Sequence, residues 1–165
     1  MKRAFIISAI LILSACTQQA LQTTYDKQAT TIESFVAAQM KADETATLTR
    51  TGGAYRVTLN DVLDPTRDSL GWNGKVTLRY ALYILTGSTL SASNLVESIK
   101  GGDPVTLSME DDLLEGLKMG LYGVQPSDEA YILFTGKYGY GNREQGMIPA
   151  RSALAYHVWI ESIEE

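Results

Sequence analysis

Apolar and polar residues alternate along several short stretches of the chain, and a period of two residues predicts β-strands. In the clearest stretch, residues 75–85, one face carries Val76, Leu78, Tyr80, Leu82 and Ile84, and the other carries Lys75, Thr77, Arg79 and Tyr83. Shorter strands are predicted at residues 54–59, 105–109, 130–135 and 153–163. The pattern predicts a sheet of about five strands, in which strand 75–85 has one face in contact with water.

Helical spacing predicts one short helix that packs on this sheet. An apolar stripe over residues 112–121 is formed by Leu113, Leu114, Leu117 and Leu121. Asp111 stands before the stripe, where an aspartate can cap a helix. Gly116 and Gly120 each cost such a helix about 1 kcal/mol relative to alanine, which indicates that this side of the helix lies close against the sheet.

A second, more N-terminal segment repeats apolar residues at helical intervals, at Ile32, Phe35, Val36 and Met40. It predicts a short amphipathic helix that is capped by Thr30 or Thr31 and ends near Lys41. Residues 60–74 contain one proline and two glycines and are predicted to form a loop. The elements together predict an α+β domain, a curled antiparallel sheet over one short helix, with an N-terminal helical extension.

The first residues have the pattern of a secretory signal. Lys2 and Arg3 precede an apolar run over residues 4–13, which is too short to span a bilayer that needs about 20 residues. Leu13-Ser14-Ala15-Cys16 resembles the lipobox of bacterial lipoproteins, and this resemblance implies cleavage before Cys16 and lipidation of its thiol. The alternative for Cys16 is a small buried thiol. Thr17 after the cysteine resembles the default for the outer membrane, facing the periplasm.

These features divide the chain into four parts. Residues 1–15 are predicted to be the signal peptide, and the Thr/Gln/Ala-rich residues 16–30 a flexible tether. Residues 31–60 form an extension with a helix and a strand, and residues 70–164 form the main domain.

Composition excludes several classes of function. Apolar residues make up 45% and charged residues 20% of the chain, as in an ordinary globular protein, and the net charge is −5. No run of Lys or Arg is present, so nucleic acid is not an expected partner. His157 is the only histidine, Glu110-Asp111-Asp112 suits a helix start, and Gly139-Tyr140-Gly141 lacks the residues of a phosphate loop. We therefore expect no metal and no cofactor.

Four segments resemble the FKBP-type peptidyl-prolyl cis-trans isomerases, in the family's order over about 90 residues. The strand 76–87, the helix 113–121 with its glycines, a flap at 138–149 and the last strand 154–160 carry the resemblance. It implies an isomerase that accelerates rotation about X-Pro bonds in proline-containing extracytoplasmic clients.

The resemblance also implies which residues surround the substrate. It places a catalytic set at Tyr140, Leu114 and Tyr156, in which the Tyr140 hydroxyl and the Leu114 backbone N–H donate hydrogen bonds to the substrate. It places the proline-binding residues at Tyr80, Leu90, Val105, Leu113, Leu117, Met147 and Ile148. For each of these residues alone, core packing is the alternative.

The chain departs from the family pattern at the pocket. Leu117 replaces the tryptophan of the pocket floor, Leu90-Ser91 stands for a Phe-Asp pair, and Ala150 replaces a flap proline. Fewer rings favour a rival interpretation, a peptide-binding chaperone or envelope assembly module that uses the same pocket without catalysis. A structural subunit that uses residues 31–60 as its interface is a third possibility.

Overall fold

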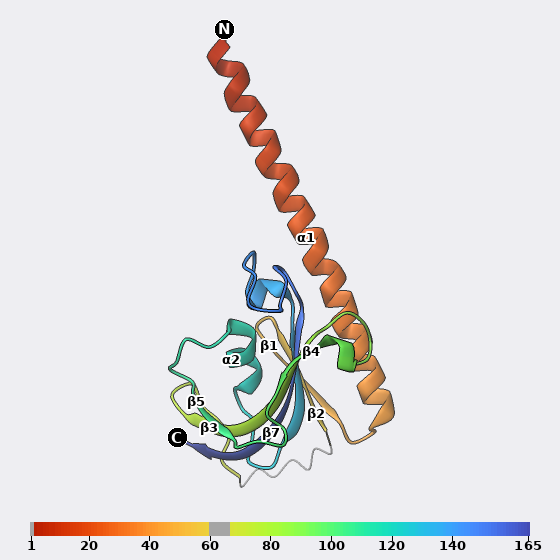
Figure 1. The fold of residues 1–165 in the computed structure, drawn as a ribbon, viewed down its shortest axis with the longest axis vertical. Coiled ribbons are helices and arrows are strands. Elements are labelled where there is room, and N and C mark those ends of the chain that lie inside the picture. The colour runs from red at the N-terminus through yellow and green to blue at the C-terminus, as the bar shows by residue number, and fades with distance from the viewer. Residues whose placement is uncertain (1, 60–66) are drawn as a thin grey trace.

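The computed structural model describes residues 2–59 and 67–165, and for residues 2–17 it describes the backbone alone. Within these residues, seven strands form one antiparallel sheet: β1 (Thr47–Thr51), β2 (Ala54–Leu59), β3 (Lys75–Ile84), β4 (Leu95–Ser98), β5 (Val105–Ser108), β6 (Glu129–Phe134) and β7 (Leu154–Glu164). The helices are α1 (Lys2–Ala42), α2 (Glu115–Leu121) and the short 3-10 turns η1 (Ala92–Asn94) and η2 (Gly136–Tyr138). The α+β class and the helical extension are confirmed (Figure 1).

The sheet has seven strands where the sequence predicted about five. Its order is β1-β2-β6-β7-β3-β4, and β5 pairs with the first half of β3 while β4 pairs with the second half. The two missed strands, β1 and β4, are five and four residues long; β1 is mostly half-buried and β4 is mostly exposed. These two strands form because they pair with a neighbouring strand, so their own sequences show little apolar periodicity.

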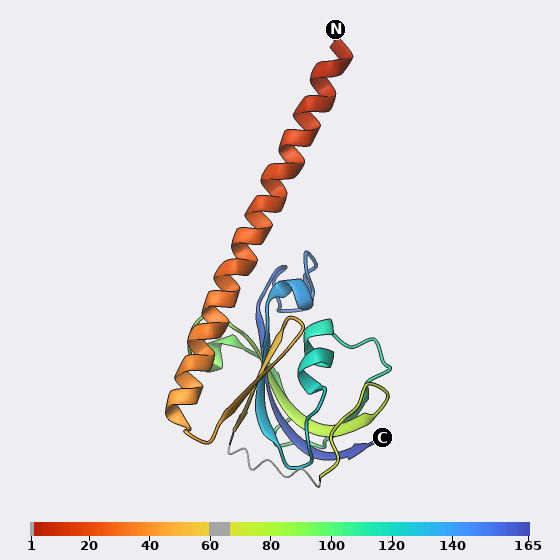
Figure 2. The same ribbon diagram turned by 180° about the vertical axis from the view of Figure 1, so that it is seen from behind.

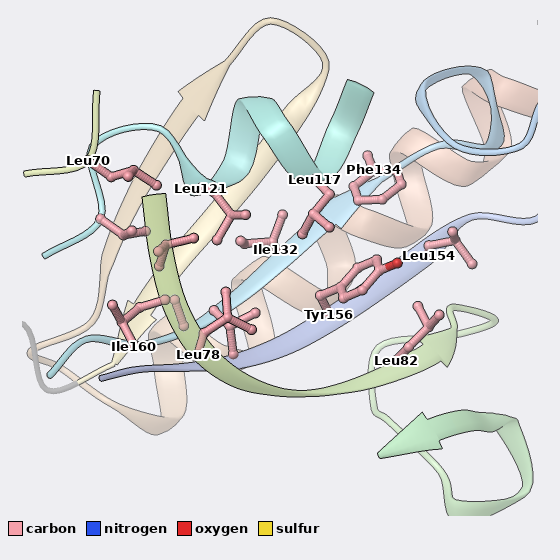
Figure 3. Packing of buried hydrophobic residues seen from close by; sticks show 14 of the residues in the cluster. Leu70, Leu78, Leu82, Leu117, Leu121, Ile132, Phe134, Leu154, Tyr156 and Ile160 are labelled. Atoms are coloured by element: carbon pink, nitrogen blue, oxygen red, sulfur yellow. The ribbon is translucent and has the colours of Figure 1, made fainter. Parts of the chain in front are cut away.

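The sheet curls around α2, and the main core lies between them (Figures 1 and 3). Leu117 and Leu121 of α2 are buried against inward side chains of β3, β6 and β7. A Cβ at Gly116 would overlap the Phe134 ring, and one at Gly120 would overlap Ile132. The close approach predicted for these two glycines is therefore confirmed.

The start of α2 differs from the prediction. The cap residue is Leu114, which has no side-chain hydrogen bond in that role. Asp111 lies earlier, where its carboxylate accepts a hydrogen bond from the Ser108 N–H at 3.1 Å and stabilises the turn after β5. The other end of α2 is held by Arg56 of β2, whose guanidinium donates to the carbonyls of Gly120 at 3.1 Å and Tyr122 at 2.6 Å.

Helix α1 is continuous where the sequence predicted a flexible tether followed by a short helix. No glycine or proline occurs before Gly52, and threonine hydroxyls donate to carbonyls one turn back, as Thr23 does to Gln19 at 2.9 Å. Thr30 and Thr31 do the same, bonding to the carbonyls of residues 26 and 27, so neither is a cap. The helix ends at Ala42, near the predicted Lys41.

The last third of α1 packs on the outer face of the sheet and forms a second core there. Ile32, Phe35 and Val36 are buried against β2, β6 and β7, and the Phe35 and Tyr131 rings meet edge to face at 5.2 Å. Each of these buried side chains contributes about 1.5–3 kcal/mol. The outer face of the sheet is thus only partly open to water, and Tyr83 of β3, predicted to be on the wet face, packs against this second core.

Further toward its N-terminus α1 leaves the domain and projects beyond it (Figures 1 and 2). No helix among the described residues is long and apolar enough to cross a membrane. The predicted loop at 60–74 lies partly outside the described residues, and residues 67–74 contain neither helix nor strand.

Candidate functional site

An apolar cavity of about 110 Å³ opens between the curled sheet and the start of α2. Residues from β3, β5, β7 and the α2 region line it: Leu78, Tyr80, Leu107, Leu113, Leu117, Tyr156 and Val158. Leu117 is 7% exposed and faces the Tyr156 ring (Figure 3). The alternation along β3 and β7 brings these side chains together, because inward positions recur at every second residue.

Two tyrosines form one wall of this cavity. The ring centroids of Tyr80 and Tyr156 are 5.7 Å apart, and Phe134 stacks behind Tyr156 at 6.0 Å. Burial, and then a hydrogen bond to Glu97, raises the pKa of Tyr80 to about 12. Burial raises the pKa of Tyr156 still further above the ordinary value. Both hydroxyls are therefore neutral near pH 7 and can act as hydrogen-bond donors.

Glu97 of β4 is a residue that sequence reasoning missed. It pairs with Leu82 of β3, and its carboxylate lies close enough to the Tyr80 hydroxyl to raise the pKa of that tyrosine. The resemblance places Leu90-Ser91 at the family's Phe-Asp pair. In the structure it is Val96, next to Glu97, that packs against the main core. Alternation in Leu95–Ser98 is the only local signal, and four residues are too few to fix a strand.

A flap, defined here as residues 136–151, connects β6 to β7 and carries Tyr140. η2 begins the flap, and farther along it Gln145 and Ile148 exchange two backbone hydrogen bonds of 2.9 Å each. Ile148 is buried against the main core, whereas Met147 is 69% exposed. The flap therefore presents one anchored and one free apolar side chain.

A second hollow of about 330 Å³ lies where the flap meets the start of α2. It is lined by Asp112, Leu113, Leu114, Glu115, Gly139, Tyr140 and Arg143. Leu113 lines both hollows, so they adjoin. Among the described residues no hydrogen bond uses the N–H of Leu114, so this donor is available at the rim.

The structure brings most of the predicted site residues together. Tyr80, Leu113, Leu117 and Tyr156 line the cavity, Leu114 and Tyr140 line the adjoining hollow, and Ile148 packs in the main core. Val105 packs against the core, but its neighbour on the same face of β5, Leu107, is the residue at the cavity. Leu90 lies elsewhere, in the second core with α1, because the segment after β3 crosses to the outer face of the sheet.

His157 lies on the outer face, away from the cavity. Its ring contacts Tyr131 at 4.3 Å and Trp159 at 4.0 Å, and its Nε2 is 2.7 Å from a Glu129 carboxylate oxygen. Burial lowers the pKa of His157, and the bond to Glu129 opposes this shift. Among the side chains that the structure describes, no three His, Cys, Asp or Glu residues gather as metal ligands would.

The curled sheet, the single covering helix and the apolar cavity between them define a domain of the FKBP fold. The family model described as FKBP-type peptidyl-prolyl cis-trans isomerase matches residues 72–161, which is more than half of the chain. The chain belongs to this family.

Individual relatives agree with the family match. A curated protein, the FKBP-type peptidyl-prolyl cis-trans isomerase FkpA from Buchnera aphidicola (subspecies Schizaphis graminum), is 27% identical over 92 residues, or 56% of this chain and 34% of that protein. The chain thus aligns with about a third of the length of this relative.

Solved structures show the same fold. A peptidyl-prolyl cis-trans isomerase from Pseudomonas syringae pv. tomato superposes with a TM-score of 0.61 at 16% identity, covering 87% of this chain and 96% of that one. The three FKBP domains of wheat FKBP73 give a TM-score of 0.60 at 17% identity, covering 72% of this chain and 50% of that one.

Proposed function

We propose that the protein is a peptidyl-prolyl cis-trans isomerase that acts on extracytoplasmic protein clients. The observation that carries the proposal is the apolar cavity of about 110 Å³ with hydrogen-bond donors at its rim. A prolyl ring would enter between Leu117 and Tyr156, and the Tyr140 hydroxyl and the Leu114 N–H would bond the substrate backbone. Tyr80, which lines the cavity, completes the polar edge.

This arrangement suits a reaction that breaks no covalent bond. Rotation about an X-Pro bond faces a barrier of about 18–20 kcal/mol because resonance keeps the amide planar. Water stabilises the charge-separated planar form, so an apolar cavity that holds the proline and excludes water favours the twisted amide. Donors that bond the substrate better in the twisted state than in the planar one then lower the barrier.

A refolding reaction limited by proline isomerisation tests the proposal directly. Folded protein at catalytic concentration should accelerate the slow phase, which otherwise takes tens to hundreds of seconds. If the protein, shown to be folded by circular dichroism, leaves this phase unchanged even at stoichiometric concentration, it is not an isomerase.

The second candidate is a peptide-binding module without useful catalysis. Two observations favour it: Leu117 leaves the pocket floor without an aromatic ring, and Met147 presents 69% of its surface on the flap. Binding of proline-containing peptides to the folded protein, with no acceleration of the refolding phase, would support this candidate over the isomerase.

We also propose that the mature chain is anchored by lipid on Cys16 and faces the periplasm from the outer membrane. The lipobox-like Leu13-Ser14-Ala15-Cys16 supports the anchor. Helix α1 would then act as a spacer in place of a flexible tether, since the 12 residues from Cys16 to Gln28 rise by about 18 Å. Mass spectrometry of the mature protein should find acyl groups on an N-terminal Cys16, and Cys16→Ser should lack them.

A further inference from the structure

Helix α1 is hydrogen-bonded to the two ends of the flap through one residue, Gln28. The side-chain amide of Gln28 accepts a hydrogen bond from the Gly136 N–H at 2.9 Å and donates one to the Arg151 carbonyl at 2.5 Å. Gly136 is the first residue of the flap and Arg151 is the last. In both views of the ribbon the flap lies beside the middle of α1 (Figures 1 and 2).

The Gln28 amide closes a ring of four hydrogen bonds. Within the flap, the Gly141 N–H donates to the Gly136 carbonyl at 2.8 Å, and the Arg151 N–H donates to the Gly141 carbonyl at 2.6 Å. Gln28 joins the two remaining groups, the N–H of Gly136 and the carbonyl of Arg151. Gly141, the middle of this ring, directly follows Tyr140.

The two hydrogen bonds of Gln28, called the bridge below, lie beyond the end of the β6–β7 pairing. The ladder between β6 and β7 ends at the pair Phe134 and Leu154, so beyond it no strand pairing fixes the flap. A Cβ at Gly136 would lie 2.5 Å from the Arg151 carbonyl carbon, which shows how tightly the two ends are pressed together. One side-chain amide, with one donor and one acceptor, satisfies both flap ends as a peptide group would.

Gln28 is itself held from another direction. Ile32 and Phe35, one and two turns further along α1, are buried in the second core at 0% and 1% exposure. The position of the amide is therefore set by the packing of α1 on the sheet. The flap ends are thereby hydrogen-bonded to a helix that is packed in the second core.

We propose that Gln28 is a positioning residue, which holds the flap ends so that the Tyr140 hydroxyl points at the substrate carbonyl. This inference rests on the proposed isomerase function. It gives the N-terminal helix a second role besides spacing, since it joins the anchored end of the chain to the catalytic flap.

The test uses the full chain in detergent solution with two substitutions at one residue. Gln28→Met keeps the length and helix propensity of the side chain and removes both hydrogen bonds. Gln28→Glu keeps the acceptor but turns a carboxylate towards the Arg151 carbonyl. Gln19→Met, at an exposed position of the same helix, is the matched control. Steady-state kinetics on a proline peptide, thermal melting, and amide hydrogen exchange at Gly141 are measured for each.

Loss of both hydrogen bonds in Gln28→Met, or of the one to Arg151 in Gln28→Glu, should lower kcat about two- to tenfold, with KM nearly unchanged and the control at wild-type activity. Exchange at the Gly141 amide should be faster in both variants. Wild-type kcat in both variants overturns the proposal. So does a loss of activity that only follows a lower melting temperature, because it would make the bridge a stability contact alone.

If the wild-type protein proves inactive, the proposed function fails and the exchange experiment decides this inference by itself. Faster exchange at Gly141 in Gln28→Met, with the control unchanged, supports the flap-positioning role in a peptide-binding protein. Unchanged exchange refutes it.

Discussion

Replacing Tyr140 by phenylalanine removes one oxygen and keeps the ring, so it tests the proposed hydrogen bond with little disturbance of packing. The Tyr140 side chain is half-buried against the main core. Within the part of the chain that the structure describes, its hydroxyl makes no hydrogen bond. The free energy of unfolding should therefore change little in Tyr140→Phe.

Catalysis should change more than stability. A hydrogen bond made chiefly to the twisted amide contributes about 0.5–1.5 kcal/mol, which corresponds to a loss of about two- to tenfold in kcat/KM. The loss should fall on kcat, with peptide affinity nearly kept, because the planar substrate binds mainly through the apolar cavity.

A protease-coupled peptide assay at several substrate concentrations separates kcat from KM. Tyr122→Phe is the matched control, since it removes a hydroxyl at an exposed tyrosine that stacks on Trp72 at 4.3 Å, outside the cavity lining. If Tyr140→Phe is folded and retains full kcat, the hydroxyl takes no part in the transition state and the assignment of Tyr140 is wrong.

Three further changes probe the cavity and the outer face. Leu117→Trp should tighten proline-peptide binding, and the adjoining cavity of about 110 Å³ should limit the overpacking cost, which otherwise runs to about 1–3 kcal/mol; severe destabilisation with unchanged affinity in calorimetry would place Leu117 in the core alone. Glu97→Ala should lower the pKa of Tyr80 from about 12 towards the ordinary 10.0 without reaching it, because burial is the larger cause, and NMR titration of the Tyr80 ring measures this; an unchanged pKa would exclude the Glu97 contact. His157→Phe should reduce the loss of stability that occurs as the pH falls below about 7, measured by urea midpoints. The folded-state pKa of His157 lies below 6.5, so the unfolded chain binds the proton first and acid favours unfolding. An equal loss of stability in the wild type and the variant would contradict this pKa shift.

Local pattern predicted the strands whose inward face is apolar over most of their length. Strands β3 and β7 alternate, and buried Val76, Leu78, Val158 and Ile160 lie where the period of two places them. Gly116 and Gly120 predicted the tight packing of α2. The cavity walls Tyr80 and Tyr156 followed from the same alternation, together with the family resemblance.

Contacts between segments that are distant in the sequence could not be predicted from such patterns. Leu90 is an apolar residue of the kind that lines a pocket, but the path of the chain after β3 places it in the second core. The short strand β4 is defined by its pairing to β3, and only that pairing brings Glu97 to Tyr80. Helix α1 is also longer than the segment that shows apolar periodicity. Threonine, glutamine and alanine residues without a helix breaker can continue a helix that packing holds at one end.

The sequence by itself determined the family, the inward faces of the long strands and the chemistry available to the site, because each depends on residue types at fixed local spacing. Only the tertiary structure decided which side chains meet. Gln28 is 108 residues from Gly136 and 123 from Arg151, and neither contact leaves a local signal. A periodic pattern shows that a face is buried, but the partner that buries it depends on how the whole chain folds.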